Sequence, residues 1–306
     1  MILCCGEARI DMQPCLTAEG RPAFAPAPGG SAFHTALALG RLGAPAGFFG
    51  RLSTDAFGTT LAEALAAAHV DTSLALRAGR PTPLGFAASP AAAMPTVYEV
   101  ADAGADGFDL PVLPESVTAL FVAGAALAAE PDGGLFEALA LRASPNRLIM
   151  LDADIRPGRI ADARAFRGRL ARLIAMADIV KLSDDDLRWL RGSGELSGQA
   201  EALLAEGPRL VVLSEGARGA TGFLPGSAPV FVPAPSVTVA DTAGAADTFN
   251  AGLMAALHRA GLLCKQAMAG LGRAAVQSAI NLGVHAAAVT VSRCGANPPF
   301  ARELVP

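Results

Sequence analysis

The stretch 241-DTAGAADTFNAG-252 combines small residues and carboxylates at the point where an apolar helix begins. Small side chains at 243–246 would bring bare backbone close to a ligand. The helix that follows would point free N–H groups and its positive dipole end at the same place, which suits an anion. Asp247 falls in the first turn of this helix, where a carboxylate either complements the dipole or takes a proton from a substrate. The spacing alone leaves both interpretations open.

The motifs of several common enzyme classes are missing from the sequence. Neither Lys181 nor Lys265 follows a glycine, which excludes a P-loop. No G-x-G-x-x-G opens a helix after a strand, and no serine stands in G-x-S-x-G. The four histidines have no metal-ligand spacing, and the five cysteines form no C-x-x-C pair, so neither a zinc site nor a disulfide framework is indicated. Glycine and carboxylate chemistry remains.

Composition narrows the class of protein further. A chain of 306 residues, 52% of them hydrophobic, can bury a large core and suits one large α/β domain. The net charge of −4 and the scattered arginines disfavour a nucleic-acid partner. The long uncharged run 81–98 contains prolines that exclude a membrane-spanning helix, and the apolar run 2–5 is too short for a signal peptide. We therefore expect a cytoplasmic protein with no membrane partner.

The elements that must position this chemistry follow an alternating pattern. Short β-like runs alternate with Ala- and Leu-rich helical stretches such as 57–69 and 162–176, as in a doubly wound parallel sheet. The β-like runs are ILCC, GFFGRL, ALFVAG, RLIMLDA, ADIVKL and RLVVLS. Two consecutive helices are expected near the C-terminus, at 245–261 and 265–288.

Two places interrupt the alternation, at about 9–28 and 77–103. Proline and small apolar residues there predict extra strands instead of helices, and these strands could pair into a small lid over the main sheet. No internal repeat or low-complexity linker divides the chain. We therefore expect a single domain over 1–306, α/β in class, with a mainly parallel sheet and a small β-stranded lid.

The pattern D-T-x-G-A-x-D-T-F-x-A-G at 241–252 resembles the C-terminal signature of the ribokinase (PfkB) family of sugar and nucleoside kinases. Other segments resemble family motifs in the same order, and together they span nearly the whole chain, with most similarity to the bacterial fructokinase branch. These segments are GEARID, 29-GGSAFHTALALGRLG-43, GRLSTDAFG, 147-RLIMLDADIRP-157, 178-DIVKLSDDDLRWL-190, 211-VVLSEGARGA-220 and 290-TVSRCGANPP-299. The resemblance implies a ribokinase-like fold.

The resemblance also implies roles at the start of the last motif. Asp247 would be the base that accepts the proton of the sugar hydroxyl as its oxygen attacks the γ-phosphate of ATP. The N–H groups of Gly244, Ala245, Ala246 and Asp247 would hold the developing phosphoryl charge. The family usually has glycine at position 246. If Ala246 had positive φ it would be strained, whereas an ordinary φ in the first helical turn is the case we favour.

The sugar site implied by the resemblance involves the N-terminal third of the chain. Asp11 would accept hydrogen bonds from sugar hydroxyls, although a turn aspartate is the alternative. Gly29 and Gly30 would let backbone approach the sugar, or would serve a tight entry into the next helix. His34 stands where the family usually has asparagine, so its contact with the sugar would change.

Three further residues are implied on the sugar side. Tyr98 and Phe86, on the predicted lid, would cover the sugar ring, although strand residues packed on a partner would look the same. Arg156 matches an arginine that some members of the family use on their substrate. The usual "DPN" before it is "DAD" here, which leaves the identity of the sugar open.

On the nucleotide side, a cap and a glycine-containing loop stand out. Ser183 and Asp186 read as a capping box at a helix start, and the resemblance adds a water-mediated role for Asp186 on Mg²⁺. The loop 214–219 suits contact with a nucleotide, although a plain turn between strands explains it equally well. The implied nucleotide-binding residues are Lys181, Ser214, Gly216 and Gly219.

The function expected from these observations is transfer of the γ-phosphate of ATP to a primary hydroxyl of a sugar, as in a fructokinase. Ribose, a keto-deoxy sugar acid or a nucleoside are alternative acceptors, and a sugar- or nucleotide-binding protein that has lost catalysis is an alternative of another class. A Rossmann oxidoreductase is a more distant one. The cofactors implied are ATP and Mg²⁺, with a monovalent cation as an addition. A homodimer through the lid would protect its apolar face and its open edge.

Overall fold

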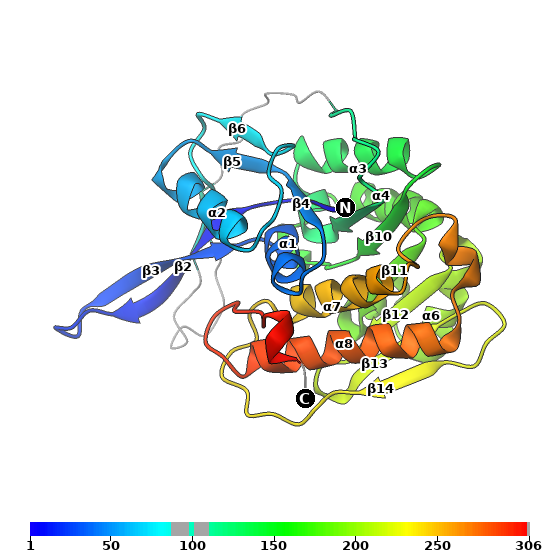
Figure 1. Ribbon diagram of the computed structural model, residues 1–306. Helices are drawn as coiled ribbons and strands as arrows, with labels where there is room; N and C mark the ends of the chain where they lie inside the picture. Colours follow the sequence, from blue (N-terminus) through cyan, green and yellow to red (C-terminus); the bar gives the residue numbers. More distant parts are fainter. Residues whose placement is uncertain (87–97, 101–109, 305–306) are drawn as a thin grey trace.

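The computed structural model describes residues 1–86, 98–100 and 110–304, and its centre is an eight-stranded sheet (Figure 1). The strand order is β14-β13-β12-β11-β10-β9-β1-β4. Neighbours from β12 to β4 are parallel, and β13 and β14 add an antiparallel hairpin at one edge. The predicted mainly parallel α/β sheet is confirmed. The strands are β1 (Ile2–Cys5), β4 (Ala46–Phe49), β9 (Ala119–Ala123), β10 (Leu148–Asp152), β11 (Ile179–Ser183), β12 (Leu210–Ser214), β13 (Gly219–Phe223) and β14 (Val230–Pro233).

The central strands are apolar at successive positions because both of their faces are covered. In β1, Ile2 and Cys4 pack into the hydrophobic core on one face, whereas Leu3 and Cys5 pack into a second core on the other. Successive side chains of a strand point to opposite faces, so a continuous apolar run is needed to fill both cores.

Helices cover the two faces of the sheet in two groups (Figure 1). The first core takes side chains from α1 (Ser31–Arg41), α2 (Ala56–Ala67), α7 (Ala245–Arg259) and α8 (Arg273–Val291). The second core takes them from α3 (Asp132–Ala143), α4 (Ala163–Met176), α5 (Asp184–Arg191) and α6 (Leu196–Ala202). The helices predicted at 57–69 and 162–176 correspond to α2 and α4.

Two boundaries differ from the sequence-based expectation. The helix expected at 265–288 begins eight residues later, at Arg273, and a short 3₁₀ turn (η5, Ala267–Gly270) precedes it. Gly270 and Gly272 explain the late start, because glycine is a poor helix former and Gly272 is the N-cap of α8. The run GFFGRL is not one strand: β4 ends at Phe49, and β5 (Arg51–Ser53) pairs instead with β6 (Leu76–Ala78).

The predicted lid is a separate four-stranded sheet of order β3-β2-β7-β8. It unites both interruptions of the alternating pattern, and the β2–β3 hairpin projects away from the body of the protein (Figure 1). The other parts of the predicted segment 77–103, at 87–97 and 101–103, lie outside the described residues. The lid strands are β2 (Arg9–Leu16), β3 (Pro22–Gly29), β7 (Leu84–Phe86) and β8 (Tyr98–Val100).

Within the described part of the chain, α8 is the one helix long and apolar enough to cross a membrane by length and composition. It packs along α7 and against β13 and β14, and Val276, Ile280 and Val284 belong to the first core. A core helix passes the same test, so the finding is weak evidence for a membrane span.

Candidate active site

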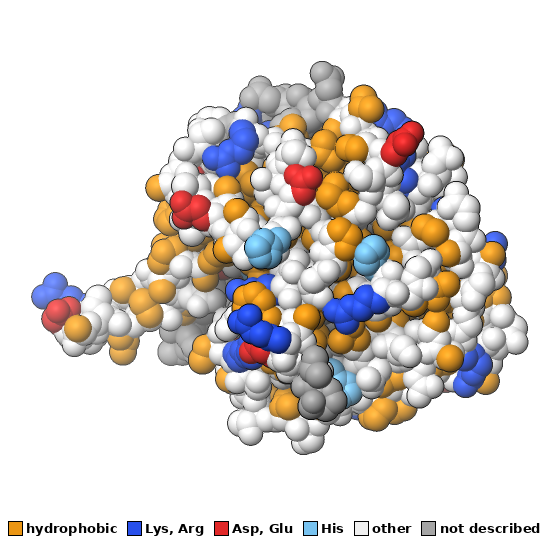
Figure 2. All heavy atoms as spheres, viewed as in Figure 1, with side chains coloured by type: hydrophobic (Ala, Val, Ile, Leu, Met, Phe, Trp, Pro, Cys, Tyr) orange, Lys and Arg blue, Asp and Glu red, His pale blue; other side chains and the backbone are white. Residues whose placement is uncertain are grey.

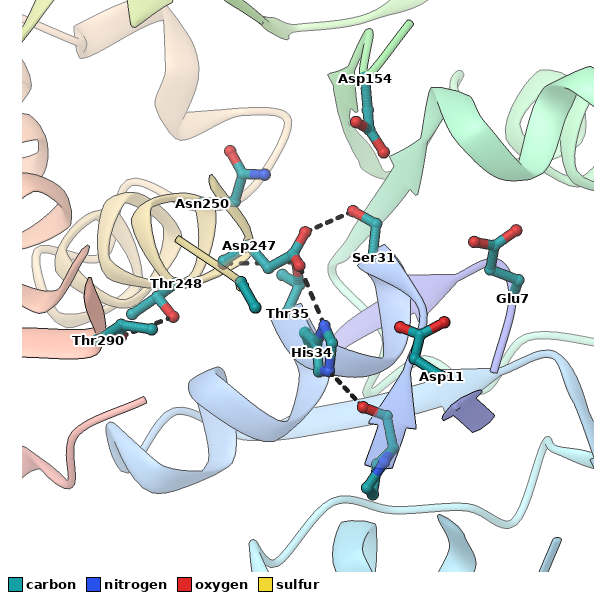
Figure 3. A network of polar contacts seen from close by, with 12 residues as sticks. Glu7, Asp11, Ser31, His34, Thr35, Asp154, Asp247, Thr248, Asn250 and Thr290 are labelled. Atoms are coloured by element: carbon teal, nitrogen blue, oxygen red, sulfur yellow. Dashed lines mark hydrogen bonds and ion pairs between the residues drawn. The ribbon is translucent and has the colours of Figure 1, made fainter. Parts of the chain in front are cut away.

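The candidate site lies where the N-terminal ends of α1 and α7 meet (Figure 3). The segments that follow β1 and β10 reach the same place, since Glu7 comes two residues after β1 and Asp154 two residues after β10. In an open parallel sheet, ligands bind outside the carboxyl ends of the strands. The fold therefore brings two helix N-termini and several carboxylates together at the carboxyl ends of the strands.

The start of α7 requires glycine at position 244. Gly244 has φ 73°, and a Cβ there would lie 2.8 Å from the Cβ of Ala296, so both conformation and space exclude a side chain. The first intrahelical bond runs from Thr248 N–H to Gly244 O, at 2.9 Å. The N–H groups before it have no acceptor inside the helix. Ala245 N–H donates to Thr242 O at 3.3 Å. Of the four N–H groups at 244–247 that we expect to face the phosphate, this one is therefore already partly occupied.

Ala246 is helical and exposed. The non-glycine residues with positive φ in the described part of the chain are His69 and Asp154, so Ala246 carries no backbone strain of this kind. The favoured case of an ordinary φ at this position is confirmed.

We predict that Ala246→Gly leaves kcat unchanged and lowers the free energy of unfolding by about 1 kcal/mol, since glycine is the poorer helix former. Urea unfolding and steady-state kinetics on the same preparation measure both quantities. Ala171→Gly, at an exposed position of α4, is the matched control and should lose similar stability. A clear rise in kcat without loss of stability would contradict the prediction.

Asp247 is held from both sides by α1. Its side chain is 12% exposed, Ser31 Oγ donates to Oδ1 at 2.5 Å, and His34 Nδ1 lies 3.3 Å from Oδ2 (Figure 3). Thr35 Oγ1 donates to the backbone oxygen of Asp247 at 3.4 Å. Ser31 and Thr35 were not among the predicted site residues. Their spacing with His34, at i, i+3 and i+4, places all three on one face of an otherwise apolar helix and could have revealed them.

Gly29 and Gly30 serve different purposes. Gly30 is the N-cap of α1 with φ 114°, and a Cβ there would clash with the backbone oxygen of Glu7. A Cβ on Gly29 would clash with Asp11 Oδ2. The tight helix entry therefore explains Gly30, whereas Gly29 makes room for the carboxylate of Asp11.

Asp11 lies within β2, so its interpretation as a turn residue is wrong. Its side chain is one-third exposed, and Arg9 Nε donates to Oδ1 at 2.6 Å. Arg9 also pairs with Glu7, and Arg159 pairs with Glu7 at 3.2 Å. Asp11 thus presents a carboxylate beside the start of α1, already oriented by an arginine (Figure 3).

Asp154 faces the same site from the segment after β10 (Figure 3). Its φ is 32°, a left-handed conformation that aspartate tolerates better than most residues. Burial, and then the charges of Asp152 and Asp247, raise the pKa of Asp154 to about 7, although Arg156 opposes the shift. Arg156, the arginine expected on the substrate, pairs with Asp154 Oδ1 at 2.7 Å. Its side chain is 61% exposed and already has an ion-pair partner within the protein.

A buried polar cluster fixes α7 to the sheet below the site. Lys181 Nζ lies 3.2 Å from both carboxylate oxygens of Asp152, and Asn250 Nδ2 donates to Asp152 Oδ2 at 2.6 Å. Lys181 is 2% exposed, so a contact with a nucleotide would require this ion pair to open, contrary to the expectation from the sequence. Asp152 and Asn250 were not predicted. The sequence signal for such a cluster was a charged residue in each of two otherwise apolar strands, Asp152 and Lys181. Buried charges are usually paired, so these two residues could have been expected to meet.

The predicted capping box at the start of α5 is confirmed. Asp186 N–H donates to Ser183 Oγ at 3.0 Å, and Ser183 N–H donates to Asp186 Oδ2 at 2.7 Å. The other carboxylate oxygen of Asp186 accepts from Ile155 N–H at 2.7 Å. The described residues contain no group of three or more His, Cys, Asp or Glu that could hold a metal ion, so direct ligation is not indicated there.

The loop 214–219 forms the connection between β12 and β13. Ser214 Oγ donates to Leu182 O at 3.3 Å, and a Cβ on Gly219 would clash with Val232 O, so these two residues have structural roles. Gly216, with φ 57°, has no heavy atom within 4 Å of the place where a Cβ would stand. Its backbone is accordingly the part of this loop open to a ligand.

The lid residues are only partly described. Phe86 packs edge-to-face against Phe24, with ring centroids 5.3 Å apart, which favours the packing interpretation for Phe86. Tyr98 stands opposite Phe86 in the β7–β8 pair, but its side chain lies outside the described part of the structure.

Comparisons with known proteins agree with this arrangement. The family model "pfkB family carbohydrate kinase" matches residues 1–302. The chain is 41% identical over 283 residues to the fructokinase of Rhizobium leguminosarum bv. trifolii, which covers 91% of this chain and 86% of that protein.

Two solved structures share the fold. A fructokinase from Xylella fastidiosa with bound ATP has a TM-score of 0.84 and 23% identity, covering 99% of this chain and 97% of that chain. A fructokinase from Vibrio cholerae O395 in fructose-, ADP- and calcium-bound form has a TM-score of 0.81 and 23% identity, covering 96% of this chain and 94% of that chain.

Proposed function

The chain belongs to the pfkB family of carbohydrate kinases, and on that premise we propose that it is an ATP-dependent, fructokinase-like sugar kinase formed by one domain over 1–306. The observation that carries the proposal is the position of Asp247, a carboxylate in the first turn of α7 beside N–H groups that have no acceptor inside the helix. Ser31 and His34 of α1 contact this carboxylate. A base and an anion cradle at the same helix start match the needs of phosphoryl transfer.

In the proposed reaction, Asp247 accepts the proton of a primary sugar hydroxyl. The hydroxyl oxygen forms a bond to the γ-phosphorus of ATP, the bond from that phosphorus to the β,γ-bridging oxygen breaks, and ADP leaves. The N–H groups of Gly244, Ala246 and Asp247 face the charge that develops on the transferred group. Ser31 keeps the Asp247 carboxylate oriented through its hydrogen bond to Oδ1.

Mg²⁺ fits this site as a companion of the nucleotide. Kinases hold Mg²⁺ largely through the phosphates of ATP, with few protein ligands and several waters. Asp186 is buried with both oxygens already bonded to backbone N–H groups, so its fit is indirect, through water. When bound, the ion would neutralise phosphate charge. Turnover in a potassium salt compared with a choline salt tests the additional monovalent cation.

The acceptor is proposed to be a neutral sugar. Asp11, Asp154 and Asp247 all face the site, and Arg156 is already paired with Asp154. An acceptor with its own carboxylate would compete with Asp154 for Arg156 and would meet the carboxylates of Asp11 and Asp247. Asp11 offers acceptor oxygens for adjacent hydroxyls instead.

A coupled ADP assay with a panel of acceptors tests the function. Fructose should be phosphorylated better than ribose, a nucleoside or a keto-deoxy sugar acid. Ligand-induced stabilisation without any turnover would support the alternative of a binding protein that has lost catalysis. The ordinary φ of Ala246 removes one of the reasons for that alternative.

The β2–β3 hairpin is the proposed dimer interface. Leu16 and Phe24 are 70% and 47% exposed, and Figure 2 shows hydrophobic side chains along the projecting hairpin. The free edge of β3 carries prolines at 22, 26 and 28. Proline offers no N–H to an added strand, so edge-to-edge pairing is disfavoured and the apolar side chains would make the contact.

We predict a dimer by light scattering at micromolar concentration, and a shift to monomer in Leu16→Glu. Leu141→Glu, at an exposed position of α3, is the matched control and should leave the mass unchanged. A monomeric parent protein would contradict the proposed interface.

A further inference from the structure

The imidazole of His34 lies between two hydrogen-bond acceptors. Nε2 is 3.0 Å from the backbone oxygen of Pro28, and Nδ1 is 3.3 Å from Oδ2 of Asp247 (Figure 3). A carbonyl oxygen and an ionised carboxylate can only accept. A neutral imidazole has a single N–H, so one of its nitrogens would direct a lone pair at one of these oxygens. Only the imidazolium form satisfies both contacts.

The surroundings of His34 favour that charged form. Ser31 donates to the other carboxylate oxygen of Asp247 at 2.5 Å, so Oδ1 serves as an acceptor. Burial lowers the pKa of His34, but the hydrogen bond and charge of Asp247, the Pro28 carbonyl and the charge of Asp11 outweigh it, and the pKa is raised. The ring of Phe33, edge-to-face with the imidazole at 5.8 Å, adds no charge.

We propose that His34 is protonated on both ring nitrogens in the resting enzyme and acts as a positioning residue for Asp247, whose role in catalysis is part of the proposed function. The imidazolium holds Oδ2 while Ser31 holds Oδ1, so the plane of the carboxylate is set from both ends. Neither hydrogen bond uses all the acceptor sites of these oxygens, and each keeps a lone pair for the sugar hydroxyl. An asparagine at this position could donate to the carboxylate only as a neutral group.

This arrangement makes the site dependent on pH. As pH rises through the raised pKa of His34, the imidazole loses one of its two N–H groups, and one ring nitrogen then directs a lone pair at an acceptor. The positive charge beside Asp247 is lost, so the hydrogen bond that orients the carboxylate becomes weaker. The free energy of unfolding should also fall as pH rises. The stabilisation that protonated His34 provides is fully present below the unfolded pKa of about 6.5 and is lost as pH rises through the higher folded pKa.

The charged state of His34 can be measured without turnover. The chain has four histidines, so the ring signals in NMR spectra are few, and His34→Asn identifies the one that belongs to position 34. We expect that signal to titrate with a midpoint above about 6.5 and to move to lower pH in Asp247→Asn. A midpoint at or below the ordinary value, or one indifferent to Asp247→Asn, would overturn the proposal.

The kinetic consequence is tested by the pH profile of kcat. The parent enzyme should lose about tenfold in kcat as His34 deprotonates, the scale of one charge-assisted hydrogen bond, whereas His34→Asn should show no such alkaline decline. Burial raises the pKa of Asp154 to about 7 beside the same carboxylate, so Asp154→Asn is the control and should keep the decline. Persistence of the decline in His34→Asn, or its loss in Asp154→Asn, would refute the assignment. If no acceptor is phosphorylated at all, the proposed function fails, and the NMR titration still decides the state of His34.

Discussion

Asp247→Asn is expected to lower kcat by roughly 10²- to 10⁴-fold, because it removes a proton acceptor from the reacting hydroxyl and keeps the size of the side chain. The amide oxygen can still accept the hydrogen bond from Ser31, and the amide NH2 can donate to Nδ1 of a neutral His34, so the start of α7 should retain its position. Binding of ATP and sugar should therefore change little. Single-turnover kinetics measures the chemical step, and calorimetry measures the two affinities.

The matched control for Asp247→Asn is Asp178→Asn. Asp178 is buried to a similar degree and accepts hydrogen bonds from Ile149 N–H and Lys265, away from the site. The Asp178→Asn variant should have a lower free energy of unfolding and a kcat near that of the parent enzyme. If Asp247→Asn kept more than about half the activity where chemistry limits the rate, Asp247 would be only a first-turn acid that complements the helix dipole.

Asp11→Ala is expected to raise the KM for the sugar at least tenfold, with a smaller effect on the KM for ATP. The estimate assumes two lost charge-assisted hydrogen bonds, each worth roughly 1.5 to 3 kcal/mol. Because Arg9 already donates to Oδ1, the other oxygen, Oδ2, is the one more available to the sugar. Steady-state kinetics with each substrate varied in turn separates the two constants.

Gly29→Ala provides a second route to the same carboxylate. The added Cβ would clash with Asp11 Oδ2 and displace it, while the backbone of Gly29 has no positive φ that would strain alanine. The KM for the sugar should rise as in Asp11→Ala. Gly79→Ala is the control, since nothing lies within 4 Å of its added Cβ. An unchanged KM in both Asp11→Ala and Gly29→Ala would remove Asp11 from the sugar site.

Local sequence pattern predicted most of the elements. The apolar runs that form β1, β9, β10, β11 and β12 are continuous because both faces of the sheet are covered. Such continuous runs can be recognised in the sequence itself. The change from small residues to an apolar helical stretch around Asp247 likewise predicted the start of α7. The late start of α8 at Arg273 shows the limit of this approach, because Ala267, Met268 and Ala269 are compatible with a helix that Gly270 and Gly272 interrupt.

The sequence alone determined the class of fold, the kinase motifs and the presence of Asp247 at a helix start, because each depends on residues close together along the chain. Only the tertiary structure decided which groups surround that carboxylate. Ser31 and His34 are 216 and 213 positions away from Asp247, and Lys181 and Asp152 meet only because β10 and β11 are neighbours in register. Whether a buried lysine meets a nucleotide or an aspartate, and whether a histidine is charged, depends on partners that packing brings together from distant parts of the chain.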